Sequence, residues 1–311
     1  ILGDWGSSDL RSNRSGPIHY HSAEIAMKFD DRCFDCLLSR VSLECSLCGA
    51  GKEQSAEIRD ECARLLEDLR TQPLSHPQIA SAVHRLAYSR LGTGDPFRRL
   101  KEESTTRALD VCRKVRPHLG TFRDHVLASV IGNTFDYGVK SHTVNDNFSQ
   151  YFEKEFQLGL AIDDCDRILP LASDVVYFTD NCGEIVFDRL LLEFLHRIGA
   201  KVTLAVREEP ILNDATLEEA LALHMDRFAD VITHTGCGCE IGVRLDCMPE
   251  PLRQAMKTCT LVISKGMANY ESLSEYHDLP PIAYLMAVKC EPIADEVGVP
   301  RGSKVAMLRF Q

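Results

Sequence analysis

The pattern that most constrains this chain is a series of short β-rich runs separated by helical segments, which begins after about residue 160. The runs are DVVYFT (174–179), KVTLAVR (201–207), DVITH (230–234), CTLVISK (259–265), PIAYLMAV (281–288) and KVAMLRF (304–310). Residues 184–199 and 215–223, between them, have the three- and four-residue apolar spacing of helices. Strands that alternate with helices indicate a mostly parallel sheet covered on both faces. We therefore predict an α/β fold, with a three-layer α/β/α domain over residues 161–311.

The residues before this series have helical patterns and almost no strand pattern. Apolar residues in segment 56–69 recur every three or four positions. Ser75, with Gln78 three residues later, has the form of a capping box at the start of a further helix. We therefore predict a helical domain over residues 27–160. Residues 1–26 are polar and show no clear period, and we expect them to form a flexible leader outside the fold.

Composition and charge exclude several classes of protein. The 311 residues carry a net charge of −11, which repels nucleic-acid phosphates on average, and no local basic patch offsets it. No uncharged apolar run approaches the length of a membrane-spanning helix. The thirteen cysteines are an odd number and no secretory signal opens the chain, so we expect a reducing, cytoplasmic setting without a full disulfide framework. The expected partner is a small molecule rather than nucleic acid or a membrane.

Polar side chains follow three of the predicted strands. Asp180 and Asn181 come directly after the first run, Asp214 lies in the segment that follows the second, and Lys265 ends the fourth. In folds of this kind, ligands bind at the edge of the sheet where the carboxyl ends of the parallel strands lie. We therefore expect these side chains to converge on one site.

The converging side chains suit a divalent metal ion and a phosphate group. Asp180, Asn181 and Asp214 offer oxygen ligands, which accept Mg²⁺, Mn²⁺, Co²⁺ or Ni²⁺ to varying degrees. Gly183 permits close approach of the backbone, and the helix that follows would present its N-terminus to an anion. Lys265 would add a positive charge for the same anion. The combination indicates metal-assisted hydrolysis of a phosphate ester.

Each of these residues also has a structural interpretation. An Asp or Asn after a strand is often the N-cap of the next helix, which would account for Asp180, Asn181 or Asp214. Lys265 could be a solvated surface lysine. The fold also leaves two other functional classes open, because one fold hosts many reactions. One is a methyltransferase or nucleotide-binding protein, although this would require a glycine-rich loop where a single glycine is present. The other is a non-catalytic, metal-dependent ligand-binding or redox-sensing module.

Six motifs are spaced along the chain from about Met27 to the C-terminus. They are CFDC (33–36), GNTFDYGV (132–139), TDNCGEIVFD (179–188), PILNDAT (210–216), SKGMANYE (264–271) and KCEPIADEVGV (289–299). In this order and combination they resemble the metal-dependent damage-control phosphatases, in particular the subfamily with an N-terminal CxxC motif. An ordered series of motifs is more specific than a lone short pattern.

The resemblance implies a helical N-terminal domain packed on an α/β domain, with the active site between them. It implies that Asp180, Asn181 and Asp214 bind the metal. It also implies a hydrolase that removes phosphate from small metabolites, often damaged or side-product sugar phosphates and related compounds. It further implies catalytic or supporting roles for five residues: Asp180, Asn133, Asp136, Glu184 and Lys265. From the residues alone, Asn133 and Asp136 fit either this role or a simple turn after a helix. Either a metal-bound water or a carboxylate would attack phosphorus.

Two CxxC pairs lie near the start of the predicted helical domain. Cys33 and Cys36 are the pair that the resemblance marks, and Cys45 and Cys48 form the second. One straight helix would place the pairs about 18 Å apart, at about 1.5 Å per residue. A single zinc holds its sulfur ligands about 4 Å apart, so a shared zinc or iron–sulfur site would require a broken helix. The alternatives are a redox or separate metal role for the first pair, and cysteines with no such role. A further pair in the segment CGC (237–239) has glycine neighbours, which predicts a tight turn.

Overall fold

The computed structural model describes residues 29–134 and 148–310. The helices come first, and strands and helices then alternate. The α-helices of the described residues are α1 (Arg32–Leu47), α2 (Lys52–Leu69), α3 (His76–Leu91), α4 (Arg98–Val115), α5 (Phe122–Asn133), α6 (Phe148–Leu158), α7 (Cys165–Ile168), α8 (Ile185–Arg197), α9 (Leu217–Ala222), α10 (Glu250–Thr258), α11 (Met267–Leu273) and α12 (Glu291–Val297). The strands are β1 (Ile162–Asp163), β2 (Asp174–Phe178), β3 (Lys201–Val206), β4 (Val231–His234), β5 (Leu261–Lys265), β6 (Ile282–Ala287) and β7 (Lys304–Arg309).

Within the described residues, the strands form one sheet in the order β1-β7-β6-β5-β2-β3-β4. Neighbouring strands are parallel, except that β6 and β7 run antiparallel. The register aligns Phe178 of β2 with Ala205 of β3 and Ser264 of β5, so the carboxyl ends of these three strands lie level. The mostly parallel sheet predicted from the sequence is confirmed, and the short strand β1 was not anticipated.

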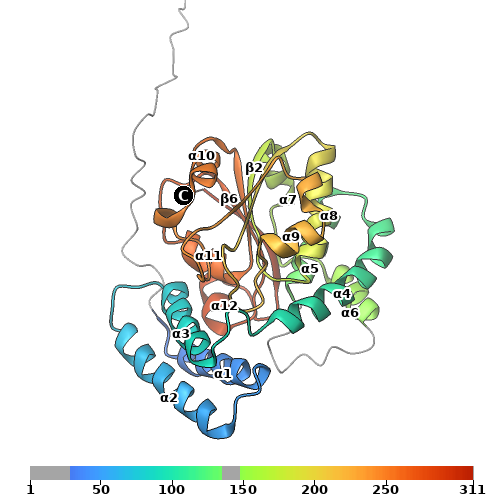
Figure 1. The fold of residues 1–311 in the computed structure, drawn as a ribbon. Coiled ribbons are helices and arrows are strands. Elements are labelled where there is room, and N and C mark those ends of the chain that lie inside the picture. The colour runs from blue at the N-terminus through green and yellow to red at the C-terminus, as the bar shows by residue number, and fades with distance from the viewer. Residues whose placement is uncertain (1–28, 135–147, 311) are drawn as a thin grey trace, which may run out of the picture.

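Helices cover both faces of the sheet, as Figure 1 shows. Every residue of β5 and β6 is buried, as expected for apolar strands enclosed between two layers. Alternate residues of β2 belong to opposite faces. Val175 and Tyr177 pack in the core that contains α5 and α8, whereas Val176 and Phe178 pack in the core that contains α10, α11 and α12. The two cores enclose the strands, and the polar loops at the strand ends lie outside these cores.

Helices α1, α2 and α3 have an apolar core of their own and lie together in the lower left of Figure 1. The predicted capping box at the start of α3 is confirmed, because the backbone N–H of Ser75 donates to Oε1 of Gln78 at 2.9 Å. Ile211 and Ile241, from loops between strands and helices of the sheet, enter this core. Helices α4 and α5 instead share the core of the sheet with α8. The division into two domains near residue 160 stays a prediction.

Some predicted features lie outside the described residues. They are the leader over residues 1–26, and Asp136 with most of its motif. Among the helices of residues 29–134 and 148–310, none combines the length and the apolar character needed to cross a bilayer.

Candidate active site

The loops after β2 and β3 are joined by backbone hydrogen bonds, and the site forms at this junction. The N–H of Ala215 donates to the carbonyl of Asp180 at 2.8 Å. Asn181 and Asp214 lie opposite one another as an isolated β-bridge. All three predicted metal ligands are buried. The structure therefore brings Asp180, Asn181 and Asp214 together, although they come from loops more than thirty residues apart in the sequence.

The interpretation of these residues as helix caps is wrong. The N-cap of α9 is Thr216, which forms a capping box with Glu219, and the N–H of Thr216 donates to Oε2 of Glu219 at 2.9 Å. Glu184 occupies the N-cap position of α8. The side chains of the three predicted metal ligands therefore have no capping role at either helix.

Asn133, the last residue of α5, connects the helical part of the chain to this site. Its Nδ2 donates to Oδ2 of Asp180 at 2.9 Å and to Oε2 of Glu184 at 2.7 Å. Its Oδ1 accepts the backbone N–H of Ala287, at the end of β6, at 2.9 Å. Asn181 donates to the same two carboxylate oxygens at 2.7 and 3.0 Å. Two amides therefore hold the carboxylates of Asp180 and Glu184 in fixed orientations.

Lys265 is fully buried, so its interpretation as a solvated lysine is wrong. Its Nζ lies 2.7 Å from Oδ1 of Asp188 and forms a short ion pair with Oε1 of Glu184. Burial alone would lower the pKa of Lys265, but the carboxylates of Asp188 and Glu184 outweigh this effect and raise it. The charge of Lys265 is therefore used by two buried acids, whereas the sequence predicted that it would serve a phosphate.

Burial and neighbouring carboxylates raise the pKa of Asp180. Burial raises the pKa of Asp180 well above its ordinary value, and the nearby carboxylates of Asp214 and Glu184 raise it further. Burial also raises the pKa of Asp214, and the charge of Arg207 opposes this shift. Acids grouped in this way stay ionised only if a cation compensates them.

Each predicted metal ligand keeps one side-chain oxygen to which no described group donates a hydrogen bond. Both amide donors bind Oδ2 of Asp180, which leaves its Oδ1. The Nδ2 of Asn181 is used as a donor, which leaves its carbonyl oxygen. Arg207 binds Oδ2 of Asp214, which leaves Oδ1. Two carboxylate oxygens and one amide oxygen are the kind of ligand set that a hard divalent cation takes.

The charges of the buried groups agree with such a cation. Four buried carboxylates share the site with two buried cations, namely Asp180, Glu184, Asp188 and Asp214 with Lys265 and Arg207. If these six buried groups are all ionised, their excess negative charge equals that of one divalent cation, before the half-buried Lys289 is counted. Lys101 is also buried nearby, but its Nζ lies 3.1 Å from each of its own partners, Asp95 and Glu219. The residues present therefore fit a hard divalent metal ion.

Three residues of this cluster were not among the predicted site residues: Asp188, Arg207 and Lys289. Asp188 follows Glu184 by four residues, so the two share one face of α8. Arg207 follows β3 directly. Lys289, which is half-buried after β6, lowers the pKa of Asp180 by its charge. The rule that ligands gather at strand ends, applied to β3 and β6, would have identified Arg207 and Lys289.

Comparison with known proteins identifies the family. A family model described as the damage-control phosphatase ARMT1-like domain matches residues 29–305. This chain belongs to the damage-control phosphatases. It is 39% identical over 291 residues to a damage-control phosphatase of Archaeoglobus fulgidus, a match that covers 90% of this chain and 99% of the relative. It is 31% identical over 285 residues to one of Pyrococcus horikoshii, covering 86% and 98% of the two chains.

A solved structure is similar over nearly the whole of this phosphatase. The crystal structure of a DUF89 family protein from Pyrococcus horikoshii superposes with a TM-score of 0.81 at 28% sequence identity. The match covers 90% of this chain and 99% of the other. The family and the fold class implied by the sequence motifs are thus both confirmed.

The two CxxC pairs of this damage-control phosphatase lie at opposite ends of α1, which is continuous from Arg32 to Leu47. A continuous helix keeps the pairs apart, so they do not share a four-thiolate site. In the parts of the chain that the structure describes, no three His, Cys, Asp or Glu side chains cluster in a way that could hold a metal. The predicted metal ligands Asp180, Asn181 and Asp214 are not a cluster of this composition, because Asn181 contributes an amide. A redox or separate metal role for Cys33 and Cys36 stays a prediction.

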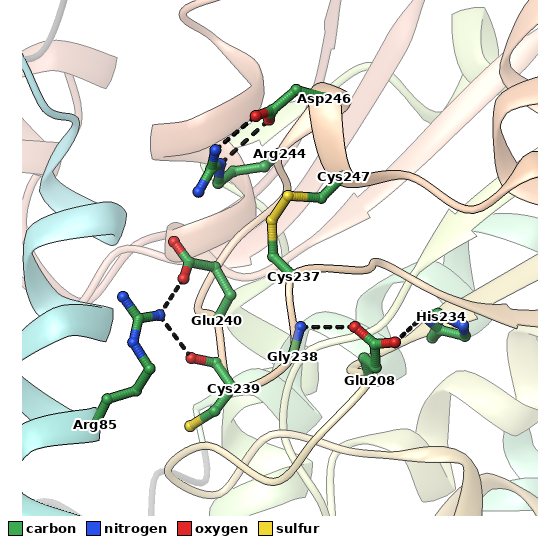
Figure 2. Close-up of a disulfide and its surroundings, with 10 residues drawn as sticks. All are labelled: Arg85, Glu208, His234, Cys237, Gly238, Cys239, Glu240, Arg244, Asp246 and Cys247. Atoms are coloured by element: carbon green, nitrogen blue, oxygen red, sulfur yellow. Dashed lines mark hydrogen bonds and ion pairs between the residues drawn. A yellow bond between two sulfur atoms is a disulfide. The ribbon is translucent and has the colours of Figure 1, made fainter.

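The turn predicted at residues 237–239 is present, and it carries a disulfide that was not predicted. Cys237 has a positive φ of 66° and is bonded to Cys247, with the Cα atoms 5.3 Å apart. Figure 2 shows the ring that this bond closes and its contact with α3, where Arg85 donates to the carbonyl of Cys239 at 3.0 Å. The other eleven cysteines are free thiols. The phosphatase therefore has one local disulfide rather than a framework.

Proposed function

We propose that this chain is a metal-dependent phosphomonoester hydrolase that acts on small phosphorylated metabolites, including damaged or side-product sugar phosphates. Its membership of the damage-control phosphatases supports the phosphatase activity. The observation that carries the metal dependence is the set of three oxygens from Asp180, Asn181 and Asp214, which lie beside an excess of buried negative charge.

Mn²⁺, Ni²⁺, Co²⁺ or Mg²⁺ would be held by Asp180, Asn181 and Asp214, since oxygen ligands accept each of these ions. When bound, the ion polarises the phosphoryl group and offsets its negative charge. The protein holds the ligand oxygens in place. Asn133 donates to Asp180 from α5, and its other contact, with Ala287, ties it to the end of β6. Asp136 is proposed to support the same site, although it lies outside the described residues.

The phosphate would bind at the start of α8. The backbone N–H groups of Gly183 and Glu184 donate to no group within the described residues, and the N-terminus of a helix of this length attracts anions. Gly183 has a positive φ of 79°, which turns the chain sharply into the helix. Lys289, within electrostatic reach of Asp180, would add a positive charge for the phosphate.

The proposed setting is a reducing cytoplasm. The eleven free thiols support it, because exposed thiols such as that of Cys36 persist where glutathione keeps them reduced. The substrate would be a soluble phosphorylated metabolite of that compartment.

The decisive experiment is phosphate release by protein stripped of metal with a chelator and then given Mg²⁺, Mn²⁺, Co²⁺ or Ni²⁺ singly. An aryl phosphate and a panel of sugar phosphates serve as substrates. We expect one or more of the ions to restore activity, and Asp180→Asn to lower the restored rate by at least about 100-fold, which is the scale of losing a principal electrostatic group.

The matched control is Asp174→Asn, at the opposite end of β2. Asp174 pairs with Lys201 at the amino end of the strand and should affect the rate little. Activity that needs no metal, or that survives Asp180→Asn in folded protein, would contradict the proposal. Metal binding without release of phosphate from any substrate would favour the ligand-binding module instead.

A further inference from the structure

Arg207 is one of the largest fully buried side chains in the described chain, with 1% of its surface exposed. It follows β3 directly, and its backbone N–H donates to the carbonyl of Ala215 at 2.9 Å. Burial of a guanidinium group is costly unless its donors are used and its charge is paired. The groups that accept its hydrogen bonds and pair with its charge therefore indicate the role of Arg207.

The guanidinium group of Arg207 contacts three different segments of the chain. Its Nε donates to Oδ2 of Asp214 at 2.6 Å, and its Nη2 donates to Oδ1 of Asn269 at 2.9 Å. Its Nη1 donates to the backbone carbonyl of Gly242 through a short hydrogen bond. One side chain thus joins the loop after β3, helix α11 and the ring closed by the disulfide.

The two partners of Arg207 other than Asp214, which are Asn269 and Gly242, are themselves held in place. The Nδ2 of Asn269 donates to the carbonyls of Thr179 at 2.9 Å and Lys265 at 2.7 Å, at the ends of β2 and β5. Gly242 has a positive φ of 74°, and an added Cβ there would lie 2.8 Å from Oγ of Ser272. Only glycine lets this backbone come so close, so the carbonyl that receives Arg207 is held in one place. The guanidinium group is therefore anchored independently of Asp214.

We propose that Arg207 is a positioning residue for the metal ligand Asp214, an inference that rests on the proposed function. By occupying Oδ2, it fixes the carboxylate so that Oδ1 is the oxygen left for the metal. A partner of this kind orients the ligand and holds its charge, and its loss typically weakens metal binding about 10- to 100-fold. Lysine would keep the charge but would not reproduce the three-way contact, because the planar fork of arginine sets the directions of its donors.

The test measures binding of Mn²⁺ alone, by titration calorimetry, to chelator-treated full-length protein. Wild type, Arg207→Gln, Arg207→Lys and Asp180→Ala are compared, with folding checked by circular dichroism. We expect Arg207→Gln to weaken Mn²⁺ binding about 10- to 100-fold and Arg207→Lys to fall between it and wild type. If Arg207→Gln fails to fold, Arg207→Lys decides the question, since it keeps the buried charge.

Arg85→Gln is the matched control. Arg85 is an arginine that also contacts the disulfide ring, at Cys239 and Glu240, but from the α3 side and with 44% of its side chain exposed. It makes no contact with Asp214, so Mn²⁺ affinity should stay within about twofold of wild type. An equal loss in Arg85→Gln would show that any disturbance of the ring has this effect, and would overturn the positioning role.

A kinetic readout separates positioning from general damage. In Arg207→Gln the Mn²⁺ concentration for half-maximal phosphate release should rise in parallel with the binding constant, while kcat at saturating Mn²⁺ stays within about threefold. A lower kcat at saturating Mn²⁺ with unchanged Mn²⁺ affinity would overturn the inference.

The failure of this inference and the failure of the proposed function are distinguishable. If wild type binds Mn²⁺ and Asp180→Ala abolishes binding while Arg207→Gln or Arg207→Lys binds normally, only the role of Arg207 is wrong. If wild type binds none of Mn²⁺, Mg²⁺, Co²⁺ and Ni²⁺, or Asp180→Ala binds them normally, the proposed metal site is wrong and the role of Arg207 falls with it.

Discussion

The Nζ of Lys265 lies 2.7 Å from Oδ1 of Asp188, and both side chains are completely buried. The pair joins the end of β5 to the first turn of α8 within the site. Removal of one partner from a buried ion pair leaves the other charge unpaired, which is much more damaging than loss of an exposed pair.

We therefore expect Lys265→Met to lower the free energy of unfolding by about 3–5 kcal/mol. The matched control is Lys201→Met, which removes a lysine from a pair of similar length with Asp174 but with 54% of the lysine side chain exposed. Its cost should be at most about 1 kcal/mol. Urea unfolding of both variants measures the difference, and equal costs would show that the buried pair is not a main support of the site.

Gly266 allows Asp180 to approach the backbone closely. An added Cβ at Gly266 would lie 1.9 Å from Oδ2 of Asp180, and the φ of Gly266 is +75°. We expect Gly266→Ala to displace the carboxylate and lower phosphatase activity by at least about 100-fold, because a predicted metal ligand would be moved.

Gly92→Ala controls for backbone strain in that experiment. Gly92 has a similar φ of +68°, but an added Cβ there would meet nothing within 4 Å. It should cost about 1 kcal/mol in unfolding free energy and leave the rate unchanged. Retention of normal activity by Gly266→Ala would mean that the position of Asp180 matters less than its contacts indicate.

Glu275 predicts a pH dependence of stability away from the site. Burial, together with the charges of Glu271 and Glu296, raises its pKa from 4.5 to about 7. An acid whose pKa is raised by folding favours the folded state while it is protonated. Its contribution is therefore fully present below about pH 4.5 and is lost as the pH rises through about 7.

Glu275→Gln should remove this dependence. We expect the variant to unfold at higher urea concentration than wild type at pH 8, and at a similar concentration at pH 4.5. Glu57→Gln, at an exposed position of α2, is the control. A difference between Glu275→Gln and wild type that does not change with pH would rule out this role of the carboxyl group.

The disulfide between Cys237 and Cys247 should stabilise the ring that contacts α3. The double variant Cys237→Ser/Cys247→Ser should lose about 2–3 kcal/mol of unfolding free energy, as expected for closure of a short loop. Reduction of wild type by dithiothreitol should have the same effect. Cys239→Ser, a free thiol within the same ring, should change little. If reduction leaves the stability of wild type unchanged, the bond does not hold this loop.

Local sequence patterns were sufficient to predict much of this fold. The run DVVYFT predicts a strand at 174–179, and β2 covers Asp174–Phe178. Ser75 and Gln78 predict the start of α3 correctly, because a capping box depends on residues within one turn. The disulfide was missed because Cys237 and Cys247 meet only through the path of the intervening loop.

Some features of the candidate site were also predictable from local sequence, and others were not. That Asp180, Asn181 and Asp214 converge follows from their positions after parallel strands, because the topology of such a sheet places its strand ends at one edge. The sequence also indicated the family, because each of the motifs that identify it is a short contiguous segment. The partners of Lys265 were decided only by the tertiary structure, which buries it against Glu184 and Asp188.

The sequence by itself therefore determined most of the elements, the alternation of strands and helices that indicates a mostly parallel sheet, and the residues at the strand ends, since each of these is a local pattern in the chain. The tertiary structure decided which charges are paired. Lys265 was paired with Asp188, and Asn133 with Asp180, by the packing of segments distant in sequence. The physical reason is that burial makes an unpaired charge or donor costly, and the partner that satisfies it is whichever group the fold brings within reach.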